Sequence, residues 1–524
     1  MTPSLNEYNF SGRSFIKEKN GFPSPGSNEE TTAFQLLQKG LAKQFCESFP
    51  NPLADKTVVI VPSLTLDIAI LSKVSGRIFY EERMLCMLML LRMPRTKVVY
   101  ITSRPIDELI IDYYLHLLPG ITGHHARERL TLLSCYDASP LSLTEKILSR
   151  PRLMKRITNA IANKEQAHLI CFNLTAFEKT LSVQLGLPVY GCDPDLLYWG
   201  TKSGSREIFK QCNIPVPPGF ENVKTISGVT ESLYALKLQN PALKKAVVKL
   251  NDGFSGEGNA IFSYKGLEAD EHLKTAIETQ LQQRLQIIAS DVSFTNFMNK
   301  LNEMHGIVEA FIEGGIKTSP SVQCRINPLG EVDVISTHDQ LLDKETGQVF
   351  LGAAFPAGDA YNVAIGKMGA GISEVLRSKG ALGRFSIDFI SVQENGEWKN
   401  YAIEINLRKG GTTHPYLMLQ FLTDGNYDSN TGIYTTASGQ PRYYFASDNL
   451  QSDAYKGLTP HDMIDIAIYH GLMYDGTKQE GVMFHLLGAL SQYGKLGVVC
   501  VGSTHEKAYH YYQKVIEVLE LECS

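Results

Sequence analysis

Two short runs of alternating apolar and polar residues, joined by an Asn-Gly pair, constrain this chain more than any other feature. They lie in the stretch 383–411, GRFSIDFISVQENGEWKNYAIEINLRKGG. A period of two places successive side chains on opposite faces of a strand, and Asn-Gly favours a tight turn between two strands. The stretch therefore predicts a β-hairpin. Its apolar face is expected to carry Phe385, Ile387, Phe389, Tyr401, Ile403 and Ile405, and its polar face Asp388, Glu404 and Asn406, with Arg384 and Arg408 at matching parity.

The register of this hairpin decides whether its polar side chains meet. A two-residue turn at Asn395-Gly396 sets Asp388 beside Ile403, which mixes the two faces. An odd loop or a β-bulge instead sets Asp388 opposite Glu404. We expect the odd loop, because it keeps the apolar faces together.

Three oxygen-bearing side chains then converge on the polar face: Asp388, Glu404 and Asn406. Two carboxylates and an amide oxygen are ligands for a hard cation, and magnesium held by one or two carboxylates plus substrate phosphates fits that set. The alternative is a solvated sheet face with ordinary charges, although such a face is usually richer in Lys and Thr. The sequence thus predicts a magnesium site on the hairpin.

An Asp on one strand followed by E-I-N-x-R on the next resembles the metal-binding signature of ATP-grasp enzymes. The longer run EINLRKGGTTHPYLMLQFLTDGNYD is similar to a narrower group, the ATP-grasp peptide ligases related to the enzyme of pheganomycin biosynthesis. The stretches YEERMLCMLMLLRMP and TSRPI resemble the Rossmann-like pre-ATP-grasp domain of that group.

The resemblance implies an α/β fold with a Rossmann-like pre-ATP-grasp domain, a two-subdomain ATP-grasp fold and a small C-terminal α/β cap. The expected boundaries are 1–50 for an N-terminal extension and helix, 51–200 for the pre-ATP-grasp domain, 201–430 for the ATP-grasp domain and 431–524 for the cap. Within the ATP-grasp domain we expect a lid at about 201–305 and a central part at about 306–430.

Composition excludes several classes of protein. A chain of 524 residues suggests two to four domains. Its net charge of −5 gives no indication of the positive surface that a nucleic-acid-binding protein needs. Nine scattered cysteines without a C-x-x-C pair argue against a disulfide framework or zinc module and for a reducing compartment. We see no secretory signal and no apolar run of membrane-spanning length, so we expect a cytoplasmic protein without a membrane partner.

Strands alternate with helices over residues 51–200, which predicts a parallel sheet covered on both faces. A dinucleotide site of the Rossmann type needs G-x-G-x-x-G after the first strand, but PSLTLD follows here. A nicotinamide-dependent dehydrogenase is therefore not expected. After the second strand, Thr102 or Ser103 either caps a helix or helps to bind an anion at its start.

Two lysines are candidate phosphate ligands. Lys202 opens a helix, and the resemblance implies a position near the ATP phosphates; the alternative is a solvated surface lysine. Lys249 lies on the strand 246–250, just before the loop NDGFSGEG, and the resemblance makes it the second ATP lysine. Because glycines in such a loop expose backbone N–H groups, Ser255, Gly256 and Gly258 are the expected phosphate cradle. A plain hairpin uses the same residues.

The strand GIVEAFI at 306–312 resembles the ATP-grasp hinge whose backbone meets the adenine edge. The resemblance places Glu309 by the exocyclic amine, Ile312 at the adenine-reading backbone, and Glu313 at the ribose. The usual ribose position carries Lys317, which is a departure from the family pattern. For Glu309 the alternative is an ordinary carboxylate on an edge strand.

Together these residues imply an ATP- and magnesium-dependent ligase that joins a small carboxylate substrate to an amine substrate through an acyl phosphate. The expected substrates are amino acids or peptides. Arg408 and Lys249 are the expected catalytic residues, and a homo-oligomer is possible. The alternatives are an ATP-grasp kinase acting on a hydroxyl, a nucleotide-binding module without turnover, and a carbohydrate- or partner-binding α/β protein.

Overall fold

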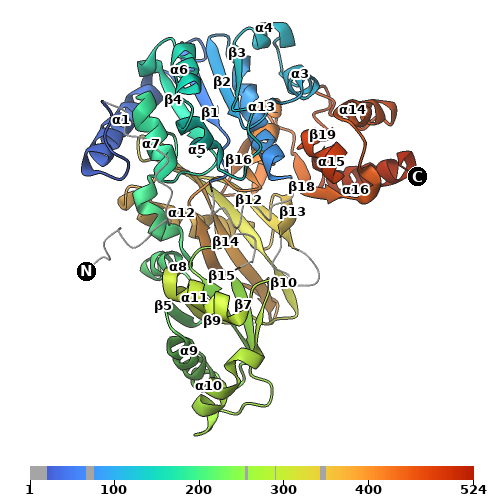
Figure 1. Cartoon of the computed structure of the whole chain (residues 1–524). Coiled ribbons are helices and arrows are strands. Elements are labelled where there is room, and N and C mark those ends of the chain that lie inside the picture. Colours follow the sequence, from blue (N-terminus) through green and yellow to red (C-terminus); the bar gives the residue numbers. More distant parts are fainter. Residues whose placement is uncertain (1–20, 66–75, 254–257, 290, 343–349, 524) are drawn as a thin grey trace.

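The three larger of the four sheets in the described residues follow one another along the molecule (Figure 1). The computed structural model describes residues 21–65, 76–253, 258–289, 291–342 and 350–523. A parallel sheet forms one end, a large antiparallel sheet the middle, and a smaller antiparallel sheet the other end. No helix in these ranges is long and apolar enough to cross a membrane.

The parallel sheet has the strand order β3-β2-β1-β4. Its strands are β1 (Lys56–Val61), β2 (Thr96–Thr102), β3 (Leu130–Ser134) and β4 (Ala167–Cys171). Val58 and Ile60 of β1 lie in one apolar core, and Val59 and Val61 lie in another. Both faces are therefore covered, as parallel sheets require, and the predicted α/β fold class is confirmed. The covering segments are α1 (Asn28–Glu47), η2 (Arg77–Arg92), α3 (Glu108–His116), α4 (Gly123–Arg127), α5 (Leu143–Leu148), α6 (Pro151–Ala160) and α7 (Ala176–Leu185), with the short turn η3 (Lys164–Gln166). The turn η4 (Pro194–Gly200) follows them in the chain, and its Leu196 and Trp199 pack against a different core.

The smaller antiparallel sheet has the order β5-β9-β6-β7-β8. Most of its strands lie in the stretch expected to form a lid, and we refer to this sheet and its helices as the lid. It comprises β5 (Gly219–Val223), β6 (Lys245–Leu250), β7 (Asn259–Ser263), β8 (Leu285–Ile287) and β9 (Gly306–Ala310). The accompanying helices are α8 (Lys202–Gln211), α9 (Ile226–Gln239), α10 (Leu273–Arg284) and α11 (Phe294–Met304). β9, the expected hinge strand, thus lies between β5 and β6 inside this sheet.

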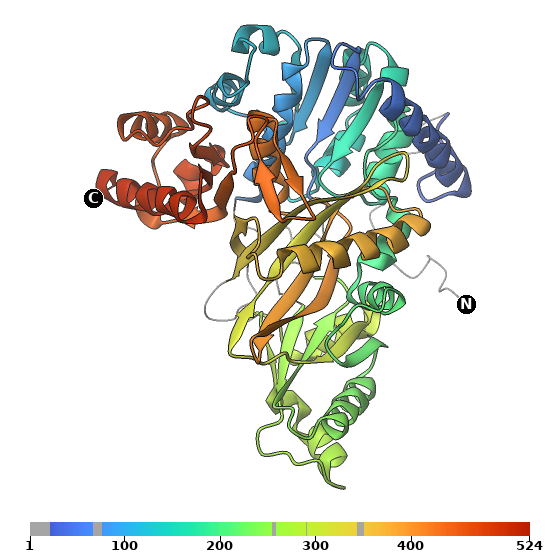
Figure 2. The same ribbon diagram turned by 180° about the vertical axis from the view of Figure 1, so that it is seen from behind.

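The central sheet holds the predicted hairpin. Its strands are β10 (Ile316–Thr318), β11 (Pro320–Ile326), β12 (Val332–Leu342), β13 (Phe350–Phe355), β14 (Gly383–Glu394), β15 (Glu397–Asn406), β18 (Tyr443–Gln451), β19 (Gly481–His485) and β20 (Lys495–Gly502). The helix α12 (Asn362–Ser378) covers one face, and its Ile365 and Ile372 share a core with Ile387 and Ile405 of the hairpin (Figure 2).

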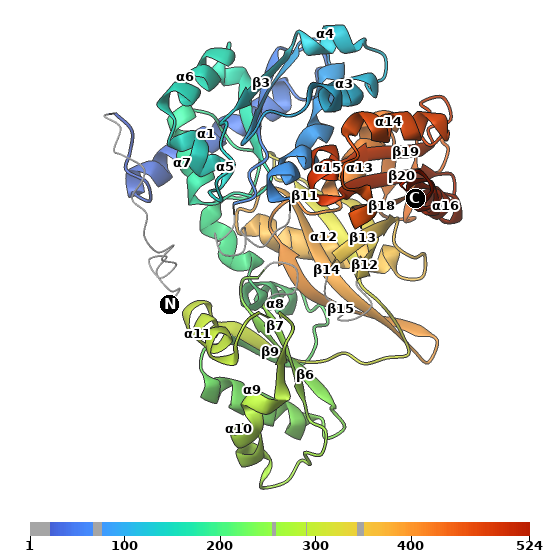
Figure 3. The ribbon, with the colours of Figure 1, turned by 45° about the vertical axis from the view of Figure 1, so that its right-hand side comes forward.

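The C-terminal segment continues this sheet, because β13 pairs with β18 and β18 with β20. Its helices are α14 (Pro460–Tyr469), α15 (Leu490–Tyr493) and α16 (His505–Glu522), with the turns η5 (Asp453–Tyr455) and η6 (Leu487–Ala489). Between the hairpin and this segment lie α13 (Thr413–Thr423), β16 (Asn426–Asp428) and β17 (Ile433–Thr435). One apolar core joins Val58 of β1 to Val498 of β20, so the C-terminal strands lie beside the parallel-sheet end (Figure 3). The domain boundaries remain predictions.

The 3-10 helix η2 carries two adjacent buried carboxyl groups. Glu81 accepts hydrogen bonds from the backbone N–H and hydroxyl of Ser103, both at 2.6 Å. Asp107 caps α3, so the expectation that Thr102 or Ser103 caps this helix is wrong. Burial, with Asp107 and Glu81 nearby, raises the pKa of Glu82 to about 8, although the Gly488 N–H partly offsets this shift.

The buried Glu82 is expected to make the stability of the folded protein depend on pH. Because its pKa is raised on folding, the stability it contributes falls as pH rises from the ordinary pKa of 4.5 towards 8. Glu82→Gln removes this ionisation, so we expect its unfolding temperature to exceed that of the wild type by several degrees more at about pH 8.5 than at about pH 5.5. Thermal unfolding at both pH values tests this, with the exposed Glu128→Gln as control. Equal differences at the two pH values would contradict the burial argument.

Candidate functional site

The hairpin turn has two residues. Asn395 and Gly396 have φ angles of 52° and 85°, and Glu394 pairs with Glu397 across them. Two consecutive positive φ angles suit Asn-Gly and match the twist of the adjoining strands. The expected odd loop is therefore wrong.

A β-bulge restores the register that the turn alone would shift. Asp388 lies opposite Glu404, whereas the next pair is Phe389 with Ala402, which leaves Ile403 as the extra residue. The prediction that Asp388 faces Glu404 is confirmed, by a bulge in place of an odd loop. Ile405 lies in the apolar core as predicted, and the bulge adds Ala402 to that core. Tyr401 and Ile403 do not lie there, and their expected place on the apolar face is wrong.

Asp388 is held by two side-chain amides. Gln340 Nε2 donates to Oδ1 at 2.7 Å, and Asn406 Nδ2 donates to Oδ2 at 2.9 Å. Burial, together with the charge of Glu404, raises the pKa of Asp388 to about 7. A neighbouring negative charge raises the pKa of a buried carboxyl group when no cation compensates it. The surroundings of Asp388 therefore favour an added cation.

Glu404 meets a cation from the lid. Lys202 Nζ lies 2.8 Å from Glu404 Oε1. Burial alone would raise the pKa of Glu404, but Lys202, Lys249 and Arg408 outweigh it and hold the pKa below its ordinary value. No group of three His, Cys, Asp or Glu side chains suited to a metal occurs in the described ranges. Two carboxylates and the Asn406 amide still form a donor set that suits magnesium.

Lys202 is the first residue of α8, whose N-cap Thr201 accepts a hydrogen bond from the Gly204 N–H. The lysine is buried, with 7% of its surface exposed. The alternative of a solvated surface lysine is therefore wrong. The position of Lys202 at the start of α8 and its ion pair with Glu404 of the central sheet together hold its ammonium group in place.

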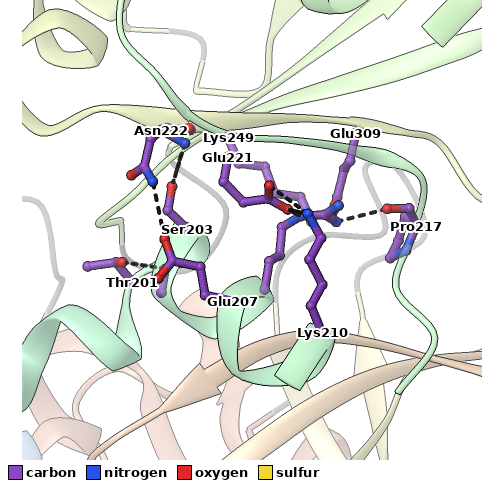
Figure 4. A network of polar contacts seen from close by, with 12 residues as sticks. Thr201, Ser203, Glu207, Lys210, Pro217, Glu221, Asn222, Lys249 and Glu309 are labelled. Carbon is purple, nitrogen blue, oxygen red and sulfur yellow. Dashed lines mark hydrogen bonds and ion pairs between the residues drawn. The ribbon is translucent and has the colours of Figure 1, made fainter. Parts of the chain in front are cut away.

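Lys249 belongs to a buried network inside the lid (Figure 4). Its Nζ lies 2.7 Å from Glu309 Oε1, and Arg206 Nη1 lies 2.8 Å from Glu309 Oε2. Arg206 also bonds Glu221 at 2.7 Å. Because β9 lies between two strands, the alternative of an edge-strand carboxylate at Glu309 is wrong. Sequence reasoning missed Arg206, because a lone arginine within a helix carries no local sign of its partner.

The loop after Lys249 joins two antiparallel strands, β6 and β7, as the sequence predicts. Ser255 and Gly256 lie outside the described residues. Gly258 is buried, and its carbonyl accepts a hydrogen bond from the Leu250 N–H at 2.8 Å. A phosphate cradle here stays a prediction.

Beyond β9 the chain is more open. Ile312 is half-buried, and Glu313 is exposed with Lys244 3.5 Å away. Lys317, at the usual ribose position, lies 4.7 Å from the centre of the Phe311 ring. The adenine and ribose contacts expected of Ile312 and Glu313 stay predictions.

Arg408 follows the hairpin, and its backbone N–H donates to the Asn406 carbonyl at 2.7 Å. Its charge acts on both carboxyl groups, since it partly opposes the rise in the pKa of Asp388 and contributes to the lowered pKa of Glu404. Gly410 donates its N–H to Thr413 Oγ1 at 3.1 Å. Asp388, Glu404, Asn406, Lys202 and Arg408 therefore come together at one place, where the lid meets the central sheet.

Family models match two parts of the chain. The description "IQCH-like, ATP-grasp" matches residues 196–288 and 268–430, and "PGM1 C-terminal domain" matches residues 463–515. The L-propargylglycine–L-glutamate ligase of Streptantibioticus cattleyicolor is 29% identical over 442 residues, 83% of this chain and 88% of that protein. The IQ motif-containing protein H of Danio rerio is 21% identical over 423 residues, 72% of this chain and 40% of that protein.

Solved structures share the fold. The biotin carboxylase of Campylobacter jejuni, solved with an ATP analogue, has a TM-score of 0.51 at 13% identity, over 87% of this chain and 89% of that one. The biotin carboxylase domain of the Hydrogenobacter thermophilus 2-oxoglutarate carboxylase, solved with ADP, magnesium and bicarbonate, has a TM-score of 0.50 at 12% identity, over 88% of this chain and 89% of that one. At such identities the likeness concerns the fold alone.

Proposed function

We propose that this chain, whose residues 196–430 match an ATP-grasp family model, is an ATP-dependent ligase that joins a small carboxylate to an amine. One observation carries the proposal: Asp388 and Glu404 face each other on the hairpin while Lys202 of the lid bonds Glu404 at 2.8 Å. The carboxylates suited to a metal ion and the lysine suited to phosphate therefore lie next to each other. The ligase that is 29% identical over most of the chain supports the same reaction class.

The reaction follows from phosphate chemistry. The substrate carboxylate oxygen attacks the γ-phosphorus of ATP, ADP leaves, and an acyl phosphate forms. The amine nitrogen then attacks the carbonyl carbon, inorganic phosphate leaves, and the nitrogen loses a proton. Such transfers depend mainly on positioning and on compensation of negative charge.

The chain offers residues for each of these tasks. Lys202 and Lys249 bind phosphate oxygens, and Arg408 compensates the charge that develops on the transferred group. Asp388, Glu404 and Asn406 would hold magnesium, which when bound neutralises charge on the nucleotide phosphates.

The remaining nucleotide contacts belong to the lid and the segment after it. Ser255, Gly256 and Gly258 cover the phosphates with backbone N–H groups. Ile312 presents its backbone to adenine, and Glu313 reaches the ribose. Glu309 lies by the exocyclic amine and orients Lys249 through the 2.7 Å ion pair.

Trapping with hydroxylamine separates a ligase from a kinase. With MgATP and a carboxylate substrate, we expect ADP release and, when hydroxylamine is added, a hydroxamate of that carboxylate detected by mass spectrometry. An amine substrate in place of hydroxylamine yields the amide and one phosphate for each ADP. A phosphorylated alcohol, with ADP release independent of any amine, would instead establish a kinase. MgATP binding without any turnover would establish a binding module.

A further inference from the structure

Two arginines lie directly opposite each other in the central sheet. Arg384 of β14 pairs with Arg325 of β11, four residues before Asp388 on the same strand β14. Because Phe385 and Ile387 share a core with α12, Arg384 and Asp388 lie on the other face of the sheet. Like charges in directly opposed positions destabilise an antiparallel pair, so we expect negative charge to compensate these two arginines.

Among the described residues, a carboxylate neutralises Arg325 but not Arg384. Arg325 donates to Asp333 Oδ2 from Nε at 3.0 Å and from Nη2 at 2.7 Å. Arg384 is half-buried, and its buried Nη1 finds no hydrogen-bond partner in the part of the chain that the structure describes. Burial lowers the pKa of Arg384, and the charge of Arg325 lowers it further. Within the described ranges the guanidinium group of Arg384 therefore lacks a counter-charge.

A third cation, Lys409, adds to this excess of positive charge. It is 8% exposed, and its Nζ donates to the Cys171 carbonyl at 2.7 Å. Burial lowers the pKa of Lys409 to about 8, and the charge of Arg384 acts in the same direction, so the two cations lie near each other. A neutral carbonyl does not cancel the charge of the ammonium group. Arg325, Arg384 and Lys409, which we call the basic cluster, thus share one carboxylate, Asp333, among the described residues.

Unsatisfied hydrogen-bond donors lie on the same face between the basic cluster and Asp388. Gln323, opposite Ser386, is 2% exposed, and its Nε2 has no partner among the described residues, although its Oε1 accepts from Thr413 Oγ1 at 3.3 Å. Ser321, opposite Asp388, is also 2% exposed, and its hydroxyl is unpartnered in the same ranges. Buried polar atoms are nearly always satisfied, so this row of donors indicates a ligand that supplies acceptor oxygens.

The segment after the hairpin connects the basic cluster to the proposed magnesium ligands. A Cβ on Gly410 would lie 3.9 Å from Ser386 Oγ, so this backbone passes over β14 between Arg384 and Asp388. Gly410 follows Arg408, the proposed charge-compensating residue, by two positions. Four residues of a strand span about 13 Å, and the arginine side chain covers part of this distance. A ligand that reaches from Asp388 to Arg384 therefore has several carbon atoms between its two ends.

We propose that the basic cluster binds a second negatively charged group of the carboxylate substrate, either a carboxylate or a phosphate; the proposal rests on the ligase function. The reacting carboxylate then lies near Asp388 and Arg408, and the donors of Ser321 and Gln323 meet oxygens between the two ends. A substrate whose only charge is the reacting carboxylate leaves Arg384 without a partner, which is unfavourable. An anionic group on Arg384 instead accepts paired N–H hydrogen bonds. The substrate is therefore at least a dianion.

Thermal unfolding in the presence of MgADP tests the proposal without requiring turnover. The probes are glutarate, adipate and pimelate, each compared at equal ionic strength with its monoamide, and 4-phosphonobutyrate as a phosphate analogue. In the wild type we expect at least one dianion to raise the unfolding temperature, and its monoamide to need an about 30-fold higher concentration for the same rise. A stronger response to the phosphonate than to every dicarboxylate would identify the second group as a phosphate. Equal responses to the dianions and the monoamides, including no response to any of them, would overturn the proposal.

Arg384→Met separates a binding role of this arginine from a structural one. Because the variant removes an uncompensated charge opposite Arg325, we expect it to unfold, without probes, at the same temperature as the wild type or a higher one. It should respond equally to dianions and monoamides. Arg384→Lys keeps a positive charge and should retain part of the preference for dianions. Arg377→Met, on α12 with 48% of the arginine side chain exposed, is the matched control and should behave as the wild type.

Two results with Arg384→Met are incompatible with the proposal. One is a wild-type preference for dianions, and the other is a marked loss of stability without probes, which would make the arginine a structural residue. A wild-type protein that binds no MgADP in calorimetry would instead contradict the ligase function itself.

Discussion

Glu404→Ala is expected to lower the turnover number for ATP by about 1000-fold or more and to leave the fold intact, because it removes a proposed magnesium ligand that lies between Lys202 of the lid and Asp388. Lys202 loses its 2.8 Å partner, and Asp388 loses the negative charge that raises its pKa. The site then holds one carboxylate in place of two. Magnesium-dependent ADP release, measured with a coupled assay, gives the turnover, and circular dichroism gives the fold.

Glu397→Ala is the matched control for this experiment. Glu397 lies on the same strand, at the turn, where its side chain is exposed. Its loss should leave turnover within about twofold of the wild type, as for most surface substitutions. Turnover retained in Glu404→Ala would remove Glu404 from the catalytic site.

Glu309→Ala is expected to lower the free energy of unfolding of the lid by about 3–5 kcal/mol, because it leaves Arg206 and Lys249 buried without their shared partner. Glu309 is 2% exposed and accepts ion pairs from both cations at 2.8 and 2.7 Å. Hydrogen exchange of the β6 and β9 amides measures this loss locally. ATP binding is expected to weaken in the same variant, since Lys249 is no longer held in place.

Glu313→Ala provides the comparison. Its carboxylate is 45% exposed, with a single distant partner in Lys244, so its loss should change stability by less than about 0.5 kcal/mol. A loss below about 1 kcal/mol in Glu309→Ala would mean that solvent compensates the two cations and that the network is not a structural element of the lid.

Local patterns predicted the elements better than the way they pair. The alternation in 383–411 is a hairpin, and the strand expected at 306–312 is β9, which ends two residues earlier. The apolar faces predicted that Asp388 lies opposite Glu404, by an odd loop or by a bulge, but the turn sequence does not tell where along the strand a bulge such as that at Ile403 occurs. The Asn-Gly pair correctly indicated a two-residue turn. The prediction of an odd loop was wrong because it gave more weight to the apolar faces than to this pair.

The partners of charged residues were harder to predict from the sequence than the strand pairing. Arg206 and Glu309 are 103 residues apart, and only the packing of α8 against the lid sheet brings them together. The C-terminal segment holds none of the site residues expected from the sequence, yet Asp448 and His485 line a pocket with Arg83. Single residues on separate strands leave no local pattern, so only the paired sheets identify them.

A crystal structure with magnesium and a non-hydrolysable ATP analogue tests the central claim most directly. We expect a metal ion about 2.1 Å from a carboxylate oxygen of Asp388 and of Glu404, in contact with Asn406 and with the phosphates. Nucleotide bound elsewhere, or a metal that none of these three side chains touches, would contradict the account.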